Sequence, residues 1–212
     1  MNYLQSYSID NRLSESAIDN LVTFLISKEQ EILDSYPFMS DFGTSLTAEH
    51  VSTRSNAYNI FKYIDEYPDL NIIFEFIKTS YWNYIDNVFL PKNFTNDQLD
   101  PSVSAWLNVI RESETIGMHK HSDQHPSGLW SFVSGTISLG VSNTSTFYND
   151  GSSTHEVKNA AGELTLFPPY FTHWTNIHTS SEPRVTLGFD VLFRHDHAPE
   201  GIDFTNNLKR FS

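Results

Sequence analysis

The spacing of apolar residues changes near residue 100, and this change constrains the fold more than any other feature of the sequence. Before that point, apolar residues recur at helical spacing in two stretches, 17–36 and 70–89. After it, apolar and polar residues alternate in short runs that are separated by Gly, Asn, Asp, Ser and Pro. Alternation at a period of two is typical of strands with one buried face. We therefore predict N-terminal helices followed by a β-rich half.

The boundaries of these elements follow from local signals. Ser14 or Ser16 is a candidate N-cap for the first helix, and Pro91 ends the second. The segment 47–67 between them is weakly helical at best. Several short strands after residue 100 favour an antiparallel sandwich or jelly roll. The predicted fold class is mainly β with N-terminal helices (α+β), in which a mainly helical region over 1–99 packs on a β core over 100–212.

The composition excludes several classes of function. The chain has no cysteine, which rules out disulfides, cysteine nucleophiles, thiolate zinc sites and iron–sulfur clusters. Any metal must therefore be held by His, Asp or Glu. The balance of 13 Lys+Arg against 26 Asp+Glu gives a net charge of −13, which argues against nucleic acid as a partner. No signal peptide and no apolar run of transmembrane length are visible, so we expect a cytoplasmic protein that does not enter a membrane.

A candidate metal site lies in the β half. In His121-Ser122-Asp123, residues two apart on a strand point to one face, so the imidazole and the carboxylate can share a cavity. His173 comes after a later predicted strand, GELTLFP, and a Pro-Pro corner. Two histidines and one carboxylate leave positions open on a non-haem Fe(II) ion. The spacing also allows His119 with His121, which would give an all-histidine set with Asp123 behind it. We favour the set that contains Asp123, and we expect His119 and His125 to face solvent or to lie behind the ligands.

A basic residue opens the last predicted strand. Arg184 precedes the apolar run VTLGFDVLF, where a buried charge is costly without an anionic partner. A dicarboxylate with one end on the metal and the other on Arg184, with the hydroxyl of Thr186 alongside, would be such a partner. The alternative is an ion pair between Arg184 and a protein carboxylate at the rim of the strand. We favour the ligand-binding interpretation.

The segments HSD, LFPPYFTHW and RVT together resemble the motifs of the Fe(II)- and 2-oxoglutarate-dependent oxygenase superfamily, and are most similar to small prolyl-hydroxylase-like oxygenases. The resemblance implies a double-stranded β-helix, a cupin-like jelly roll, as the core. It implies iron on His121, Asp123 and His173, which would be the catalytic residues, and 2-oxoglutarate as cosubstrate on Arg184 and Thr186. The implied activity is that of a dioxygenase, which hydroxylates a substrate with O2 and releases succinate and CO2. No motif indicates the primary substrate.

Two other functions fit part of the sequence. Gly162, Pro168 and His173 partly follow the second cupin motif, which suggests a metal-dependent dioxygenase or isomerase that does not use 2-oxoglutarate. The first cupin motif needs a Glu after its two histidines, whereas His121 is followed by Gln124, His125 and Pro126. The second alternative is a jelly roll that binds a ligand without catalysis, because a fold does not determine a function.

Overall fold

The computed structural model describes residues 3–9, 12–55, 57–88, 101–121, 130–140, 144–193 and 208–211. Two long helices and two short 3-10 helices occupy the N-terminal part of the described chain: α1 (Glu15–Ser35), η1 (Val51–Arg54), η2 (Ile60–Tyr63) and α2 (Asp69–Val88). The strands are β1 (Gln5–Ser8), β2 (Ser102–Ile110), β3 (Trp130–Gly140), β4 (Ser145–Asn149), β5 (Thr154–Lys158), β6 (Glu163–Phe167), β7 (Thr172–Thr175), β8 (Arg184–Phe193) and β9 (Lys209–Arg210).

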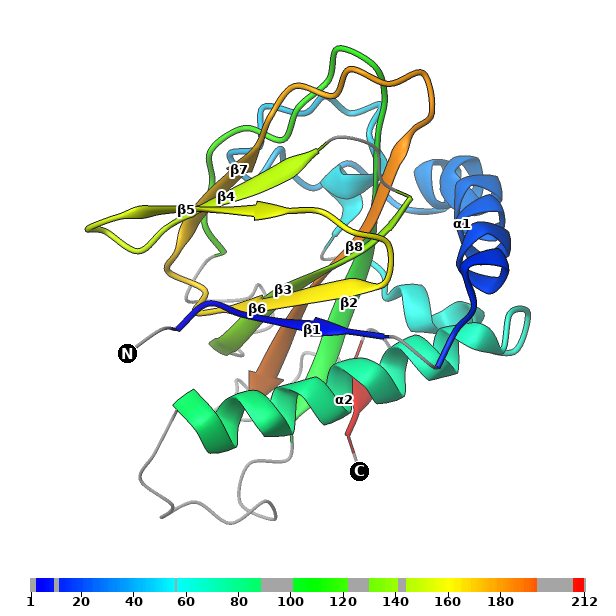
Figure 1. The fold of residues 1–212 in the computed structure, drawn as a ribbon. Coiled ribbons are helices and arrows are strands. Elements are labelled where there is room, and N and C mark those ends of the chain that lie inside the picture. The colour runs from blue at the N-terminus through cyan, green and yellow to red at the C-terminus, as the bar shows by residue number, and fades with distance from the viewer. Residues whose placement is uncertain are drawn as a thin grey trace, which may run out of the picture.

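These strands form two antiparallel sheets (Figure 1). The larger sheet has the order β1-β6-β3-β8-β2-β9, and the smaller has the order β5-β4-β7. An isolated antiparallel bridge between His119 and His173 adds the segment before residue 121 to the free edge of β7. The larger sheet therefore has β8 near its centre, between β2 and β3, and the smaller sheet ends at the two bridged histidines.

The helices cover one face of the larger sheet. Ser14 caps α1 by accepting a hydrogen bond from the amide of Ala17 at 3.2 Å. One stripe of α1 is buried, including Leu21 and Leu25, and α1 contacts β2 and β3. Helix α2 packs on β6 in the same way, with Ile73 and Ile77 fully buried. The outward rows of the sheet and the two helices form one apolar core.

The fold class predicted from the sequence is confirmed: the described chain is mainly β, with two long helices on a two-sheet core. The N-terminal region also supplies β1, which pairs with β6 in register from Gln5 opposite Leu166. The weakly helical segment 47–67 contains η1 and η2 instead of a longer helix. The division into a helical region over 1–99 and a β core over 100–212 stays a prediction.

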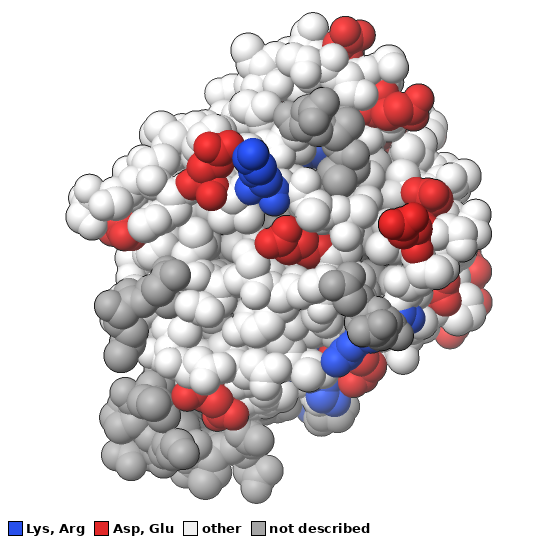
Figure 2. Space-filling view, in the orientation of Figure 1, with Lys and Arg blue, Asp and Glu red and all other residues white. Residues whose placement is uncertain are grey.

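The surface charge matches the acidic composition. On the face shown in Figure 2, acidic side chains lie at several separate places, and the basic side chains lie near acidic ones and form no broad patch. Within the described residues, no helix is both long enough and apolar enough to span a membrane.

Candidate metal and cosubstrate site

The inner face of β8 lines a cavity of about 320 Å³ between the two sheets. Alternation along the strand places four residues on this face: Arg184, Thr186, Gly188 and Asp190. Strand β2 lies beside β8 and contributes Trp106 opposite Gly188 and Asn108 opposite Thr186. The floor of the cavity therefore combines polar residues with Gly188 and Trp106.

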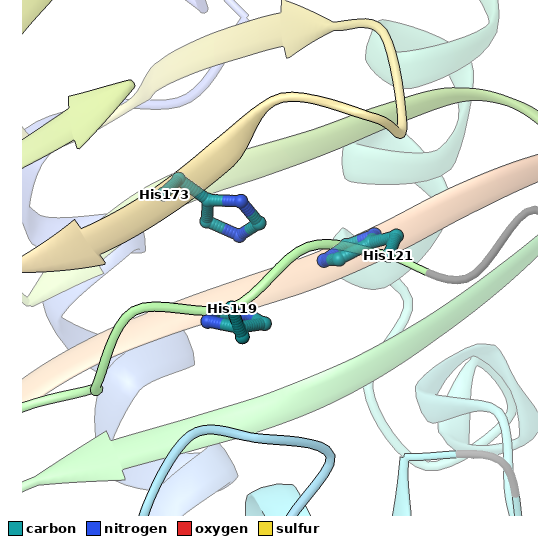
Figure 3. Close-up of side chains that lie close together, drawn as sticks. All are labelled: His119, His121 and His173. Carbon is teal, nitrogen blue, oxygen red and sulfur yellow. The ribbon is translucent and has the colours of Figure 1, made fainter. Parts of the chain in front are cut away.

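Three histidines converge on this cavity. His173 comes from β7, and His119 and His121 come from the bridged segment beside it (Figure 3). The backbone of His119 donates to the carbonyl of His173 at 3.0 Å, and the backbone of His173 donates back at 2.8 Å. One ligand nitrogen from each of the three side chains lies within 4.8 Å of the others. Nitrogens that share one ion at about 2.1 Å are at most about 4.2 Å apart, so binding needs only small side-chain movements.

Each of the three imidazoles is held through its Nδ1 atom by a group that can only accept a hydrogen bond. The partners are the carbonyl oxygen of Gly117 for His119 at 2.9 Å, Oδ1 of Asp190 for His121 at 2.7 Å, and the carbonyl oxygen of Phe171 for His173 at 3.2 Å. In the neutral form of each imidazole, Nδ1 therefore carries the proton and the lone pair is on Nε2. This is how histidines are held in metal sites, where the second nitrogen donates to an oxygen.

The charge state of two of the histidines also suits a metal. Burial lowers the pKa of His119 to about 4, and the neighbouring His121 adds to this effect. Burial also lowers the pKa of His173 well below its ordinary value, with contributions from His119 and His121. Both imidazoles are therefore neutral near pH 7, as metal ligation requires. Imidazole is a suitable ligand for Fe, Zn, Cu and Ni.

Arg184 is a buried cation with an incomplete set of partners. Its side chain donates from Nη2 to the hydroxyl of Thr146 at 3.1 Å, but Nε and Nη1 are buried without a hydrogen-bond partner. Burial lowers the pKa of Arg184 to about 10, and the nearby Tyr148 opposes this effect, so the guanidinium is charged near pH 7. No carboxylate among the described residues pairs with it, which argues against the alternative of a protein ion pair. An anionic ligand in the cavity would supply the missing partner.

The neighbours of Arg184 are also polar. Thr186 accepts a hydrogen bond from Nδ2 of Asn108 at 3.2 Å, which leaves its hydroxyl proton free to donate to another group. The hydroxyl of Ser52, on η1, lines the same cavity and is buried without a partner. The cavity therefore contains unused hydrogen-bonding groups at more than one point of its wall.

Gly188 shapes the cavity near the histidines. A Cβ atom at this position would lie 2.7 Å from the indole of Trp106, so only glycine lets the indole cross the strand. The Trp106 ring in turn lies 5.4 Å from the ring of His121, measured between centroids. Gly188 therefore permits the aromatic wall that lies against His121.

The structure brings together four residues singled out from the sequence: His121, His173, Arg184 and Thr186 all line the cavity. Asp123 and His125 lie outside the described residues, so their roles stay predictions. We expected His119 to face solvent or to lie behind the ligands, but its ring lines the cavity. The bridge to His173 explains this, because bridged residues on neighbouring strands point to the same face.

Sequence reasoning missed Asp190. This residue lies in the apolar run of β8 at an even spacing from Arg184, and it is 7% exposed. Its carboxylate accepts hydrogen bonds from His121, Ser131 and Ser134. The sequence did contain a signal for Asp190: it is a second charged residue on the same face of an otherwise apolar strand as Arg184.

The sequence matches no protein-family model and no curated protein. Solved structures do share its fold. The prolyl-4-hydroxylase of Pseudomonas putida is 11% identical, with a TM-score of 0.55, over 92% of this chain and 95% of that one. The non-heme alpha-ketoglutarate-dependent carbocyclase SnoK from nogalamycin biosynthesis is 12% identical, with a TM-score of 0.52, over 91% of this chain and 80% of that one. The chain thus shares the jelly-roll fold of these two enzymes.

Proposed function

We propose that this protein is a non-haem Fe(II)- and 2-oxoglutarate-dependent oxygenase that hydroxylates its substrate. The observation that carries the proposal is the combination, in one cavity, of three imidazoles whose ligand nitrogens lie within 4.8 Å of one another and a buried arginine with two unpaired nitrogens. The imidazoles suit a divalent transition metal, and the arginine suits a carboxylate. An iron ion held by the imidazoles and a 2-oxoglutarate molecule held by Arg184 would meet both needs.

The metal ligands that we propose are His121, His173 and one further residue. His119 is one candidate for this third residue, because its ligand nitrogen lies within 4.8 Å of those of the other two histidines. Asp123, the carboxylate favoured from the sequence, is the other candidate. With either set, iron, 2-oxoglutarate and O2 together supply the oxidising power for C–H hydroxylation, with succinate and CO2 as the other products.

The side chains around the metal position and protect the reactants. Nε and Nη1 of Arg184, which have no hydrogen-bond partner, would bind a carboxylate of 2-oxoglutarate, and the Thr186 hydroxyl would donate to the same group. The aromatic side chains of Phe42, Trp106 and Trp174 line the cavity and exclude water from the reacting groups. The partners are therefore 2-oxoglutarate, O2 and a substrate that the cavity admits. The cytoplasmic location expected from the sequence stays a prediction.

The metal site is tested by His173→Ala, measured as Co(II) binding by calorimetry. We expect this variant to lose Co(II) binding, because His173 belongs to both candidate ligand sets. His155→Ala is the matched control: His155 is a histidine on β5 with a 42% exposed side chain, which pairs with Asp150 outside the cavity. Undiminished Co(II) binding by His173→Ala would contradict the proposed site.

The cosubstrate site is tested by Arg184→Ala, with 2-oxoglutarate titrated into the Mn(II)-loaded protein. We expect 2-oxoglutarate binding to weaken far more than Mn(II) binding, because the substitution removes one end of the clamp only. Arg111→Ala is the control, since Arg111 pairs with Glu29 away from the cavity. Equal loss of both ligands in Arg184→Ala would mean that the arginine is structural. Metal binding by the wild-type protein without any 2-oxoglutarate binding would favour the cupin alternative.

The third ligand is identified by a comparison of His119→Ala with Asp123→Ala. If His119 is the ligand, His119→Ala weakens Co(II) binding more strongly and shifts the Co(II) absorption bands, while Asp123→Ala leaves the bands in place. The opposite result would assign the third position to Asp123.

A further inference from the structure

We propose that Asp190 is a positioning residue for the metal site, which holds His121 with Nε2 toward the metal and supplies a negative charge behind it. This inference rests on the proposed function, because it assigns His121 as a ligand. It adds a residue that no motif of the sequence indicated.

The geometry fixes both ends of the contact. Oδ1 of Asp190 lies 2.7 Å from Nδ1 of His121, and the same oxygen accepts from the hydroxyl of Ser131 at 2.9 Å and from that of Ser134. The side chains of Asp190 and His121 are 10% and 9% exposed. Because the carboxylate is held by three donors, it has little freedom to turn away from the imidazole.

The chemistry of the contact distinguishes His121 from the other two histidines. His119 and His173 donate to neutral carbonyl oxygens, whereas His121 donates to a carboxylate. A charged acceptor makes the imidazole a stronger donor of electron density to a metal.

The charge matters because a set of three imidazoles is neutral. A carboxylate ligand would bring one negative charge to the ion directly. Asp190 brings the same charge one hydrogen bond further away, through His121. The side chain is therefore suited to stabilise a divalent cation without occupying a coordination position.

The test is Asp190→Asn, which keeps the size of the side chain and removes its charge. We expect Co(II) affinity, measured by competition with a chelator, to fall by about 10- to 100-fold, with a shift of the Co(II) absorption bands. 2-Oxoglutarate affinity at saturating metal should stay within about twofold. Asp150→Asn is the matched control, because Asp150 forms an Asp–His pair with His155 at 3.1 Å outside the cavity, and this variant should bind Co(II) normally.

A folded Asp190→Asn protein with unchanged Co(II) affinity and bands would overturn the inference. If this variant does not fold, the metal-free wild-type protein decides: 15N NMR of the neutral form of the His121 imidazole should show its proton on Nδ1, and a proton on Nε2 instead would overturn the inference. The proposed function fails separately, if the wild-type protein binds no Co(II) at all.

Discussion

The two faces of β8 differ sharply in the residues that they carry. On the outer face, Val185, Leu187, Phe189 and Val191 are fully buried in the core that the sheet shares with the helices. On the inner face, the alternate residues are Arg184, Thr186, Gly188 and Asp190, which are also buried but are polar or small. Adjacent residues on one strand therefore have opposite environments at nearly equal burial.

The outer row stabilises the fold, whereas the inner row lowers the stability of the ligand-free protein and forms the ligand site. Burial of the outer row removes apolar surface from water, which is the main favourable contribution to folding. Burial of Arg184 with two nitrogens unpaired is unfavourable in the absence of a ligand. We therefore expect outer-row substitutions to change stability and inner-row substitutions to change ligand binding.

The largest effect on stability should come from the outer row. Leu187 is fully buried, and Leu187→Ala should lower the free energy of unfolding by about 2–5 kcal/mol, because it leaves a cavity in the core. Urea denaturation measures this change. Co(II) affinity of the folded fraction should stay the same, and a large loss of affinity would break the proposed separation of the two faces.

Arg184→Met should have the opposite effects: stability should be kept and ligand binding should be lost. Removal of a buried, incompletely paired charge should leave the metal-free protein equally stable or stabilise it by up to about 4 kcal/mol, by analogy with the replacement of buried ion pairs by apolar residues. The same variant should lose measurable 2-oxoglutarate binding. Urea denaturation measures the stability of the variant, and calorimetry measures its 2-oxoglutarate binding. Strong destabilisation would show that Arg184 supports the fold.

Gly135 and Gly188 offer a matched pair of substitutions, because the first faces the core side of the larger sheet and the second faces the cavity side. A Cβ atom on Gly135 would lie 2.2 Å from the ring of Phe189 in the core, and one on Gly188 would lie 2.7 Å from the indole of Trp106 beside His121. Both alanine variants should lower the free energy of unfolding by about 1–3 kcal/mol through overpacking. Only Gly188→Ala should also weaken Co(II) binding. A similar loss in Gly135→Ala would mean that the site responds to the core as a whole.

The smallest effect should come from Thr186→Val, which removes one hydroxyl from the inner row. The loss of a hydrogen bond of about 0.5–1.5 kcal/mol corresponds to a weakening of 2-oxoglutarate binding by up to about tenfold. Calorimetry on the Mn(II)-loaded protein measures it, with Thr186→Ser as the control that keeps the hydroxyl. If Ser and Val weaken binding equally, the methyl group and not the hydroxyl matters.

Local patterns in the sequence predicted much of the fold. The helical stripes gave α1 and α2, and the alternating runs gave β2, β3, β4, β6 and β8. Strand β1 is only four residues long, and β7 also has four, so neither has enough alternation to be recognised. Segment 47–67 has no strong period, and its two 3-10 helices depend on their packing against β2 and α2.

Fewer features of the candidate site than of the fold could be predicted from the sequence. His121, His173, Arg184 and Thr186 follow motif spacing, and the structure brings them to one cavity. His119 and Asp190 depend instead on tertiary contacts: the former on its bridge to His173, the latter on the approach of His121 to β8. No local pattern specifies a contact between residues 69 positions apart along the chain.

The most direct test of the proposed function is an anaerobic titration of Fe(II) into the protein with and without 2-oxoglutarate, followed by visible absorption. We predict a metal-to-ligand charge-transfer band that appears only when both are present and that saturates at one equivalent of each. Iron binding without this band, or no iron binding at all, would contradict the assignment of the cavity to Fe(II) and 2-oxoglutarate.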